Sequence, residues 1–256
     1  MIELNKIYNE DCLEGMKRIP DGSVDCIVCD LPYGVLNKQS EGGGWDNAIP
    51  FEPMWNEYLR ITKPNAAIIL FGQGMFTAKL MMSNKKMWRY NIFWDKCRTT
   101  GFLNAKKVPL KRTETISVFY DKHPTYHPQM RKCLPHERNH SRGKQINGQT
   151  NRCYGKFGKA DDIITDEKYP TDIVVFQRNV HDSFHPTQKP VALIQYLIRT
   201  YSNEGDLVLD NCSGSGTTAI SCIKEKRNFI CFEKDETYWK KSVERVENEQ
   251  QQLTLF

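Results

Sequence analysis

The sequence predicts an α/β protein with a mostly parallel sheet and helices on both faces. Short apolar runs of strand length alternate with segments of helical periodicity along most of the 256 residues. Such alternation is typical of a doubly wound sheet. A glycine-rich turn at residues 210–218, between an apolar run and a helix, is the kind of turn at which such sheets bind ligands.

The first part of the chain supplies strands and helices in alternation. The run Val24–Cys29 is short and almost wholly apolar, as in a parallel strand buried on both faces. A glycine-rich loop is expected at Gly42–Trp45. The other elements expected here are strands at Lys6–Asn9, Ala66–Phe71, Tyr90–Trp94 and Glu114–Tyr120, and helices at Asp11–Ile19, 52–62 and 75–84.

The last third of the chain repeats the alternation. Pro190 suits the first turn of a helix at Val191–Tyr201, because that turn needs no backbone N–H from it. The other elements expected are strands at Asp172–Phe176, Asp206–Asp210 and Asn228–Glu233, and helices at Thr217–Lys226 and 236–250.

Composition indicates a cytoplasmic protein. No run approaches the roughly 18 consecutive apolar residues of a membrane span, and the first residues lack the pattern of a secretory signal. Nine cysteines in irregular positions favour free thiols in a reducing compartment over a disulfide framework. Cys26 and Cys29 lie within one expected strand without a second such pair, so we expect neither zinc nor redox chemistry there.

Positive charge is concentrated in the middle of the chain. Residues 122–159 contain nine lysines and arginines and one acid, Glu137, interleaved with aromatic residues and histidines. Cations bind phosphates and aromatic rings stack on bases, so this irregular segment, 122–168, is expected to contact nucleic acid. The residues expected to make the contacts are Lys132, Arg138, Arg142, Lys144, Arg152 and Lys156.

The glycine-rich turn has the features of a nucleotide-type cofactor site. Gly214 and Gly216 let a ligand approach the backbone, and the following helix presents free N–H groups. Glu233 ends the next strand, where a carboxylate can accept hydrogen bonds from two ribose hydroxyls. These features suit NAD and S-adenosylmethionine equally.

The tetrapeptide Asp30-Leu31-Pro32-Tyr33 follows a buried strand and suits chemistry on an exocyclic amine. The lone pair of such an amine is delocalised into the ring, which makes it a poor nucleophile. A carboxylate and a backbone carbonyl that accept its two N–H groups would localise the lone pair, and an aromatic ring would hold the flipped base. Asp30, the carbonyl of Leu31 or Pro32, and Tyr33 supply these groups.

Five segments taken in order resemble the beta group of DNA amino-methyltransferases, in which the catalytic tetrapeptide precedes the glycine turn. Two departures from the common pattern are present: Leu31 stands where Pro is frequent, and Asn211-Cys212 where Pro-Phe is frequent. The five segments are Asn9–Leu13, Asp30–Tyr33, His185–Pro190, Asp210–Thr218 and Glu233.

The resemblance implies a circularly permuted Rossmann-like fold and S-adenosylmethionine as cofactor. Asp30, Pro32 and Tyr33 would be catalytic. The expected cofactor-binding residues are Asp11, Cys12, Asp30, His185, Thr187, Lys189, Asp210, Cys212, Gly214, Ser215, Gly216, Thr217, Thr218 and Glu233.

The expected reaction is methylation of adenine N6 in double-stranded DNA at a specific site, as in a restriction-modification system. Asp at the first position of the tetrapeptide is commoner in adenine-specific members. Cytosine-N4 methylation is the nearest alternative, followed by an NAD-linked oxidoreductase and a non-catalytic DNA-binding module. RNA as substrate and a homodimer also stay open, and the recognition sequence is not readable.

The expected organisation is a catalytic half at 1–121, the inserted recognition region at 122–168, a cofactor-binding half at 169–250 and a tail at 251–256. The tail residues Gln252–Phe256 resemble a peptide that binds the bacterial sliding clamp. Zinc ligation by Cys133, His136, His140 and Cys153 is considered but not expected, because that order of ligands is uncommon.

Overall fold

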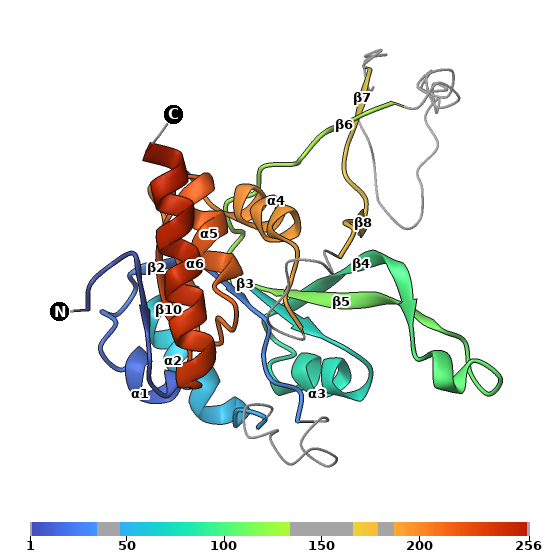
Figure 1. Cartoon of the computed structure of the whole chain (residues 1–256), viewed down its shortest axis with the longest axis horizontal. Helices are drawn as coiled ribbons and strands as arrows, with labels where there is room; N and C mark the ends of the chain where they lie inside the picture. The colour runs from blue at the N-terminus through green and yellow to red at the C-terminus, as the bar shows by residue number, and fades with distance from the viewer. Residues whose placement is uncertain (1, 35–46, 134–165, 179–186, 255–256) are drawn as a thin grey trace, which may run out of the picture. The chain divides into compact units, whose positions relative to one another are not determined.

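The computed structural model describes residues 2–34, 47–133, 166–178 and 187–254 (Figure 1). The chain forms two units, which are described separately. The larger comprises Met1–His127 and Asp172–Phe256, and the smaller comprises Pro128–Thr171. The predicted organisation placed the insertion at 122–168, a range that overlaps the smaller unit.

An eight-stranded sheet forms the centre of the larger unit (Figure 1). All its strands run in one direction except β5, which is antiparallel to both of its neighbours. The mostly parallel α/β fold expected from the sequence is thereby confirmed. In spatial order the strands are β1 (Lys6–Tyr8), β10 (Asn228–Phe232), β9 (Leu207–Asp210), β2 (Val24–Cys29), β3 (Thr62–Gly72), β5 (Lys111–Phe119), β4 (Trp88–Thr100) and β8 (Ile173–Val175).

Helices cover both faces of the sheet, and each face has its own apolar core. Alternate residues of one strand enter different cores, because successive side chains of a strand point to opposite faces. Cys26 and Val28 of β2 face one side, and Ile27 and Cys29 face the other. The first face packs against α4 (Val191–Tyr201), α5 (Thr217–Lys224) and α6 (Glu236–Thr254), and the second against α1 (Cys12–Met16), α2 (Phe51–Ile61) and α3 (Met75–Ser83).

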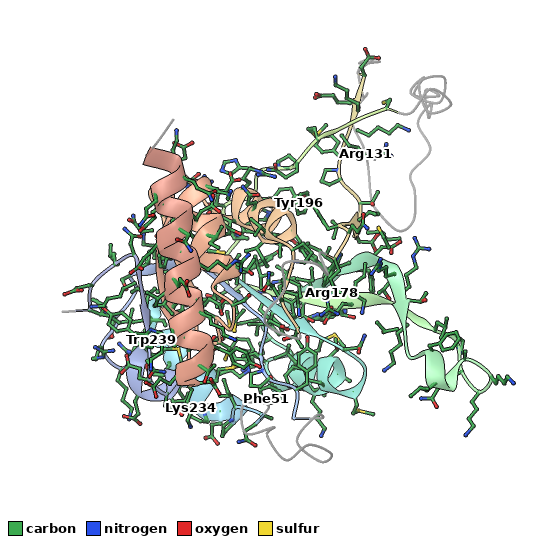
Figure 2. All side chains as sticks on the ribbon, viewed as in Figure 1. Phe51, Arg131, Arg178, Tyr196, Lys234 and Trp239 are labelled. Atoms are coloured by element: carbon green, nitrogen blue, oxygen red, sulfur yellow. The ribbon has the colours of Figure 1, made fainter. Side chains whose placement is uncertain are left out.

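The beginning and the end of the larger unit meet at one edge of the sheet. Strand β1 pairs with β10, so that Lys6 lies opposite Ile230. Trp239 points from α6 toward the N-terminal strand (Figure 2), and its indole Nε1 donates to the Ile7 carbonyl at 2.9 Å. The sheet is complete although its first strand comes from the start of the chain, as the predicted circular permutation requires.

The bounds of β2 and α4 agree with those predicted, whereas the hairpin of β4 and β5 is longer. We predicted strands at 90–94 and 114–120, but β4 continues to Thr100 and β5 begins at Lys111. The additional residues are mostly polar and lack the alternation that marks a half-buried strand. A 3-10 helix at Phe102–Asn104 lies in the connection.

The smaller unit contains one short antiparallel pair. Strand β6 (Arg131–Lys132) pairs with β7 (Glu167–Lys168), and the Cys133 amide donates to the Asp166 carbonyl at 2.7 Å. Neither strand was predicted, since two residues are too few to show periodicity. In the described part of the chain, no helix is long and apolar enough to cross a membrane.

The contact between Gly15 of α1 and Phe232 of β10 generates a stability prediction. A Cβ at Gly15 would lie 2.3 Å from the ring of Phe232, which is fully buried. Helix propensity alone would make Gly15→Ala stabilising by about 1 kcal/mol. Overpacking of this kind costs about 1–3 kcal/mol, so we expect net destabilisation in urea unfolding. The exposed neighbour Glu14 gives a control, Glu14→Ala, which should change little; a more stable Gly15→Ala protein would contradict the prediction.

Candidate active site

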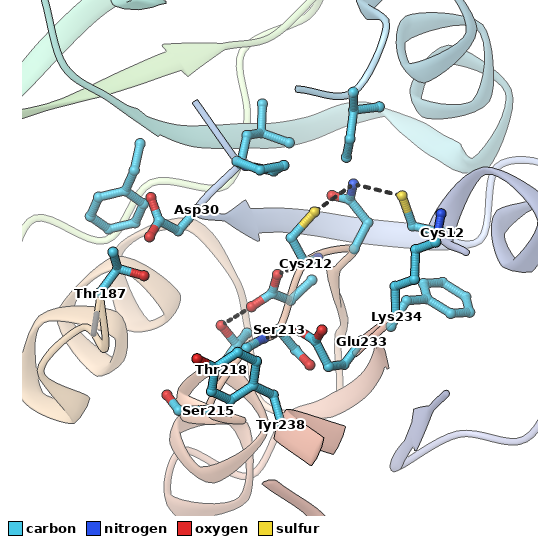
Figure 3. Close-up of a pocket in the computed structure, with 18 of the residues that line it drawn as sticks. Cys12, Asp30, Thr187, Cys212, Ser213, Ser215, Thr218, Glu233, Lys234 and Tyr238 are labelled. Carbon is cyan, nitrogen blue, oxygen red and sulfur yellow. Dashed lines mark hydrogen bonds between the residues drawn. The ribbon is translucent and has the colours of Figure 1, made fainter. Parts of the chain in front are cut away.

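A cavity of about 540 Å³ lies at the carboxyl ends of the parallel strands (Figure 3). The carboxyl ends of parallel strands lie at one edge of the sheet, where α/β folds bind their ligands. Most of the residues that line the cavity come directly after β1, β2, β9 and β10 or directly before α4. Four of the five segments named above therefore meet in one place together with part of the fifth, Thr187–Lys189.

One end of the cavity is built around the buried ammonium of Lys189, which is 8% exposed. Its Nζ lies 2.5 Å from Asp30 Oδ2 and 3.5 Å from Glu114 Oε1. The Tyr33 hydroxyl donates to Asp30 Oδ1 at 2.9 Å and lies 3.3 Å from Glu114 Oε1. The ring of Phe71 lies 5.0 Å from the same ammonium. Two acids, a lysine and a tyrosine therefore form one connected network.

Burial and the neighbouring charges together set the pKa values of this network. It raises the pKa of the Asp30 carboxyl; the Lys189 ammonium opposes that change, and the Glu114 carboxylate adds to it. Burial lowers the pKa of Lys189, but the charges of Asp30 and Glu114 outweigh this effect and raise it. Burial and the same two carboxylates raise the pKa of Tyr33 well above its ordinary value. Tyr33 therefore keeps its proton and acts as a donor.

The glycine turn lies at the other end of the cavity and is held by hydrogen bonds from its own residues. Asp210 accepts from the Thr218 hydroxyl at 2.5 Å and from the Cys212 amide at 3.1 Å. Gly216 has φ +73°, and a Cβ there would lie 3.1 Å from the Cβ of Ser242, so α6 packs directly on the turn. The turn joins the first network, because the Thr217 hydroxyl lies 3.4 Å from the Lys189 carbonyl.

Two carboxylates and two unpaired polar atoms also face the cavity. Glu233 accepts from the amides of Gly214 and Asp235, both at 2.8 Å; burial raises its pKa, against the effect of these bonds. Burial raises the pKa of Asp11, but hydrogen bonds from Lys234 and the Leu13 amide outweigh it and lower the value. Ser213 Oγ and Gln188 Oε1 are buried and have no hydrogen-bond partner among the described residues. Unpaired buried polar atoms are costly, which favours a polar ligand here.

Two thiols beside the cavity contact one amide. Asn211 Nδ2 lies 3.6 Å from both Cys12 Sγ and Cys212 Sγ, as the dashed lines of Figure 3 show. The Tyr58 hydroxyl donates to Asn211 Oδ1 at 2.5 Å. Asn211-Cys212, the pair that departs from the family pattern, thus forms a polar floor where Pro-Phe would be apolar.

Most of the predicted site residues lie together. Fourteen of the sixteen predicted cofactor-binding and catalytic residues line the cavity, and Gly216 shapes the turn beside it. His185 lies outside the described residues. The cavity group is Asp11, Cys12, Asp30, Pro32, Tyr33, Thr187, Lys189, Asp210, Cys212, Gly214, Ser215, Thr217, Thr218 and Glu233.

Most of the residues predicted to contact nucleic acid or considered for zinc ligation lie outside the described residues. Lys132 is exposed in β6, whereas Arg138, Arg142, Lys144, Arg152 and Lys156 are not described. Cys133 is buried in the smaller unit, and His136, His140 and Cys153 are not described. Among the described residues, no three His, Cys, Asp or Glu side chains form a metal site. Gln252–Thr254 continue α6, and clamp binding stays a prediction.

Glu114 is the residue that the sequence analysis missed. It was expected only as the start of a strand. Its register opposite Trp94 places it at the same end of the sheet as Asp30. No motif surrounds it, and the only signal is an acid between two threonines at the start of an apolar run.

Comparisons with known proteins agree with this geometry. A family model described as DNA methylase matches residues 24–244. The type II methyltransferase M1.MboII of Moraxella bovis is 29% identical over 247 residues, covering 90% of this chain and 92% of that protein.

Solved structures share the fold. A complex of M1.HpyAVI with SAM matches with TM-score 0.63 and 20% identity, covering 94% of this chain and 98% of that one. The PvuII DNA methyltransferase, described as cytosine-N4-specific, matches with TM-score 0.66 and 16% identity, covering 95% and 90%.

The buried carboxyl of Asp210 generates a prediction about pH. Burial raises its pKa to about 6 from an unfolded value of 3.8, against the bonds from Thr218 and Cys212. The protonated form is favoured in the fold, so its contribution to stability is complete below pH 3.8 and is lost as the pH rises through 6. Relative to Asp210→Asn, which cannot titrate, the free energy of unfolding of the native protein should fall by roughly 2–3 kcal/mol between pH 4 and pH 7.

Urea unfolding of both proteins at several pH values measures this difference. A gap between the two free energies of unfolding that stays constant with pH would contradict the prediction. Such a constant gap would place the pKa of Asp210 at its ordinary value, whereas a change confined to pH below 4, with the native protein losing stability as the pH falls, would mean that the fold lowers this pKa.

Proposed function

The chain belongs to the DNA methylase family, and we propose that it transfers a methyl group from S-adenosylmethionine to the N6 amine of an adenine flipped out of DNA. The observation that carries this proposal is that Asp30 and the glycine turn face one cavity. Direct transfer of a methyl group between two bound molecules requires that the group binding the target amine and the cofactor site face the same cavity.

The cavity's groups suit S-adenosylmethionine, which would supply an electrophilic methyl group. Glu233 has one lone pair left on each oxygen for ribose hydroxyls, since each already accepts one amide N–H. Asp11 would accept from the adenine amine of the cofactor, and the unpaired Ser213 hydroxyl offers a further polar contact. The structure of M1.HpyAVI, which shares this fold, is a SAM complex.

Asp30 would orient the target amine. Its two oxygens already bind Lys189 and Tyr33, but a carboxylate has about four acceptor positions, so one N–H can be added. The Lys189 ammonium opposes the effect of burial on Asp30 and so favours the ionised, better-accepting form. A carbonyl of Leu31 or Pro32 would accept the second N–H. The bound cofactor would supply its methyl group to the amine nitrogen and leave as a neutral thioether, and the Asp30 carboxylate, which would already accept an N–H of the amine, would take the proton that the nitrogen gives up.

Tyr33 would stack on the flipped base. Its ring lies 4.7 Å from that of Phe76, and its hydroxyl is bound to Asp30. Contacts on two sides hold the ring in one orientation, which lowers the entropy lost when a base stacks on it.

The choice of adenine rests on the first residue of the tetrapeptide. Asp at this position resembles adenine-specific members of the family more than cytosine-specific ones. The nearest alternative is cytosine-N4 methylation, because the PvuII enzyme with this fold is cytosine-N4-specific. The basic residues of 122–168 would contact the DNA around the target base.

Loss of the Asp30 carboxylate should abolish methyl transfer. In Asp30→Ala we expect the rate to fall by at least about 100-fold, because an oriented acceptor of this kind contributes that much. Affinity for S-adenosylmethionine should change little, as Glu233, Asp11 and the glycine turn are untouched. Transfer of labelled methyl groups to DNA and calorimetric titration of the cofactor measure the two effects.

Asp21→Ala, which replaces an exposed aspartate, serves as the control and should keep full activity. Substantial residual transfer by Asp30→Ala would show that another group orients the amine. Loss of cofactor binding together with activity would mean that Asp30 acts mainly on the cofactor.

The identity of the modified nucleoside distinguishes methylation of adenine from methylation of cytosine. DNA methylated by the purified protein should release N6-methyldeoxyadenosine on enzymatic digestion, which mass spectrometry identifies. N4-methyldeoxycytidine in its place would overturn the assignment to adenine while leaving the amino-methyltransferase reaction intact. DNA incubated with Asp30→Ala provides the blank.

A further inference from the structure

The hairpin formed by β4 and β5 extends beyond the sheet as an arm, defined here as residues 98–112 (Figure 1). The neighbouring strand β8 pairs with β4 only as far as Asp95. The arm contains the end of β4, the 3-10 helix and the start of β5. Gly101, with φ +87°, turns the chain out of β4 in a conformation that favours glycine.

The arm begins at a defined anchor. The Asp95 carboxylate accepts from the Cys97 amide at 2.8 Å and from Arg112 Nε at 2.7 Å. These bonds join the two strands at the base of the arm, where the pairing register is irregular. The arm is therefore attached to the sheet on both of its strands.

The arm is strongly basic. It contains five cations and no acid within fifteen residues. Among the described residues, only one of these cations, Arg112, makes an ion pair, with Asp95. The other four cations are Arg98, Lys106, Lys107 and Lys111.

Its tip is apolar and uncovered. Phe102 is 81% exposed, Leu103 is 97% exposed and Val108 is 55% exposed. Large apolar side chains that protrude together from a basic surface are unusual unless they bind something. The charge of the arm indicates what binds there, because a surface that has cations and no acids complements a polyanion.

The arm is continuous with the catalytic network. Glu114, which lies 3.5 Å from Lys189, is two residues beyond Arg112 on the same strand. At about 3.4 Å per residue, Phe102 lies roughly 10–20 Å along the hairpin from Glu114. This length corresponds to about three to six base-pair steps of DNA. A duplex whose target base enters the cavity therefore passes within reach of the arm.

We propose that the arm is a second DNA-contacting element, in which the lysines and arginines bind phosphates while Phe102 and Leu103 press against the bases beside the flipped nucleotide. Apolar wedges flanked by cations unstack base steps in this way, and unstacking lowers the cost of extruding a base. The proposal rests on DNA being the substrate, as set out above, and adds a contact outside residues 122–168.

The charged part of the proposal predicts a change in salt dependence. Each phosphate contact contributes about 0.9 to the slope of log affinity against log salt concentration. Lys106→Ala/Lys107→Ala should lower the magnitude of that slope by up to about 1.8 for a 30-base-pair duplex of arbitrary sequence. Lys85→Ala/Lys86→Ala is the matched control. It removes two adjacent exposed lysines before the start of β4, at the end of that strand away from the arm, and should leave the slope unchanged.

The apolar part predicts a separate effect. Phe102→Ala/Leu103→Ala should keep the salt slope, because no charge is removed, and should slow methyl transfer to plasmid DNA by about tenfold or more. The matched control is Met82→Ala, an exposed apolar residue of α3, which should transfer at the normal rate.

The outcomes separate this proposal from the proposed function. If the native protein methylates DNA and both arm variants behave like it, the arm does not contact DNA and the proposed function stands. If the Phe102→Ala/Leu103→Ala protein halves its mass in light scattering with normal transfer, the tip binds a second copy of the chain and the proposal is overturned. If the native protein neither binds nor methylates DNA, the proposed function itself fails.

Discussion

The buried ammonium of Lys189 is the interaction on which the arrangement of the site depends. An ammonium removed from water costs several kcal/mol unless it is paired and hydrogen-bonded. Asp30 and Glu114 pair with it, and they come from the end of β2 and from β5. The backbone of the same residue meets Thr217 at the start of α5. One charge thus holds together the catalytic tetrapeptide, the antiparallel strand and the glycine turn, which are far apart in the chain.

The elements that could be predicted were those whose burial requires a recognisable pattern of apolar and polar residues. Strand β2 is apolar throughout because both of its faces are covered, and α4 begins at a proline and has a distinct apolar face. The arm has no such pattern, because no layer covers it, and the ends of β4 and β5 were therefore missed. Similarly, the tetrapeptide and the glycine turn have local chemistry, whereas Glu114 acquires its partners only through the register of β4 and β5.

The spatial distribution of charge was likewise only partly predictable from the sequence. The excess of cations in 122–159 is evident in the sequence, whereas the basic character of the arm was not singled out there. Elsewhere in the chain acids and bases pair, as Asp25 does with Lys63 and Glu225 with Arg199, while four cations of the arm have no acidic partner among the described residues. A count along the chain cannot reveal this, because ion pairing depends on tertiary contacts.

The pairing of β1 with β10 has a consequence for synthesis of the protein. A nascent chain emerges at about 5–20 residues per second. The partner of β1 follows about 220 residues later, so the first strand waits roughly 10–45 s on the ribosome before it can join the sheet. Throughout that time Ile7 and the apolar side of α1 lack the strand and helix that later cover them. The order of segments that brings the catalytic tetrapeptide out first thus leaves this edge of the sheet incomplete until the last part of the chain has been made.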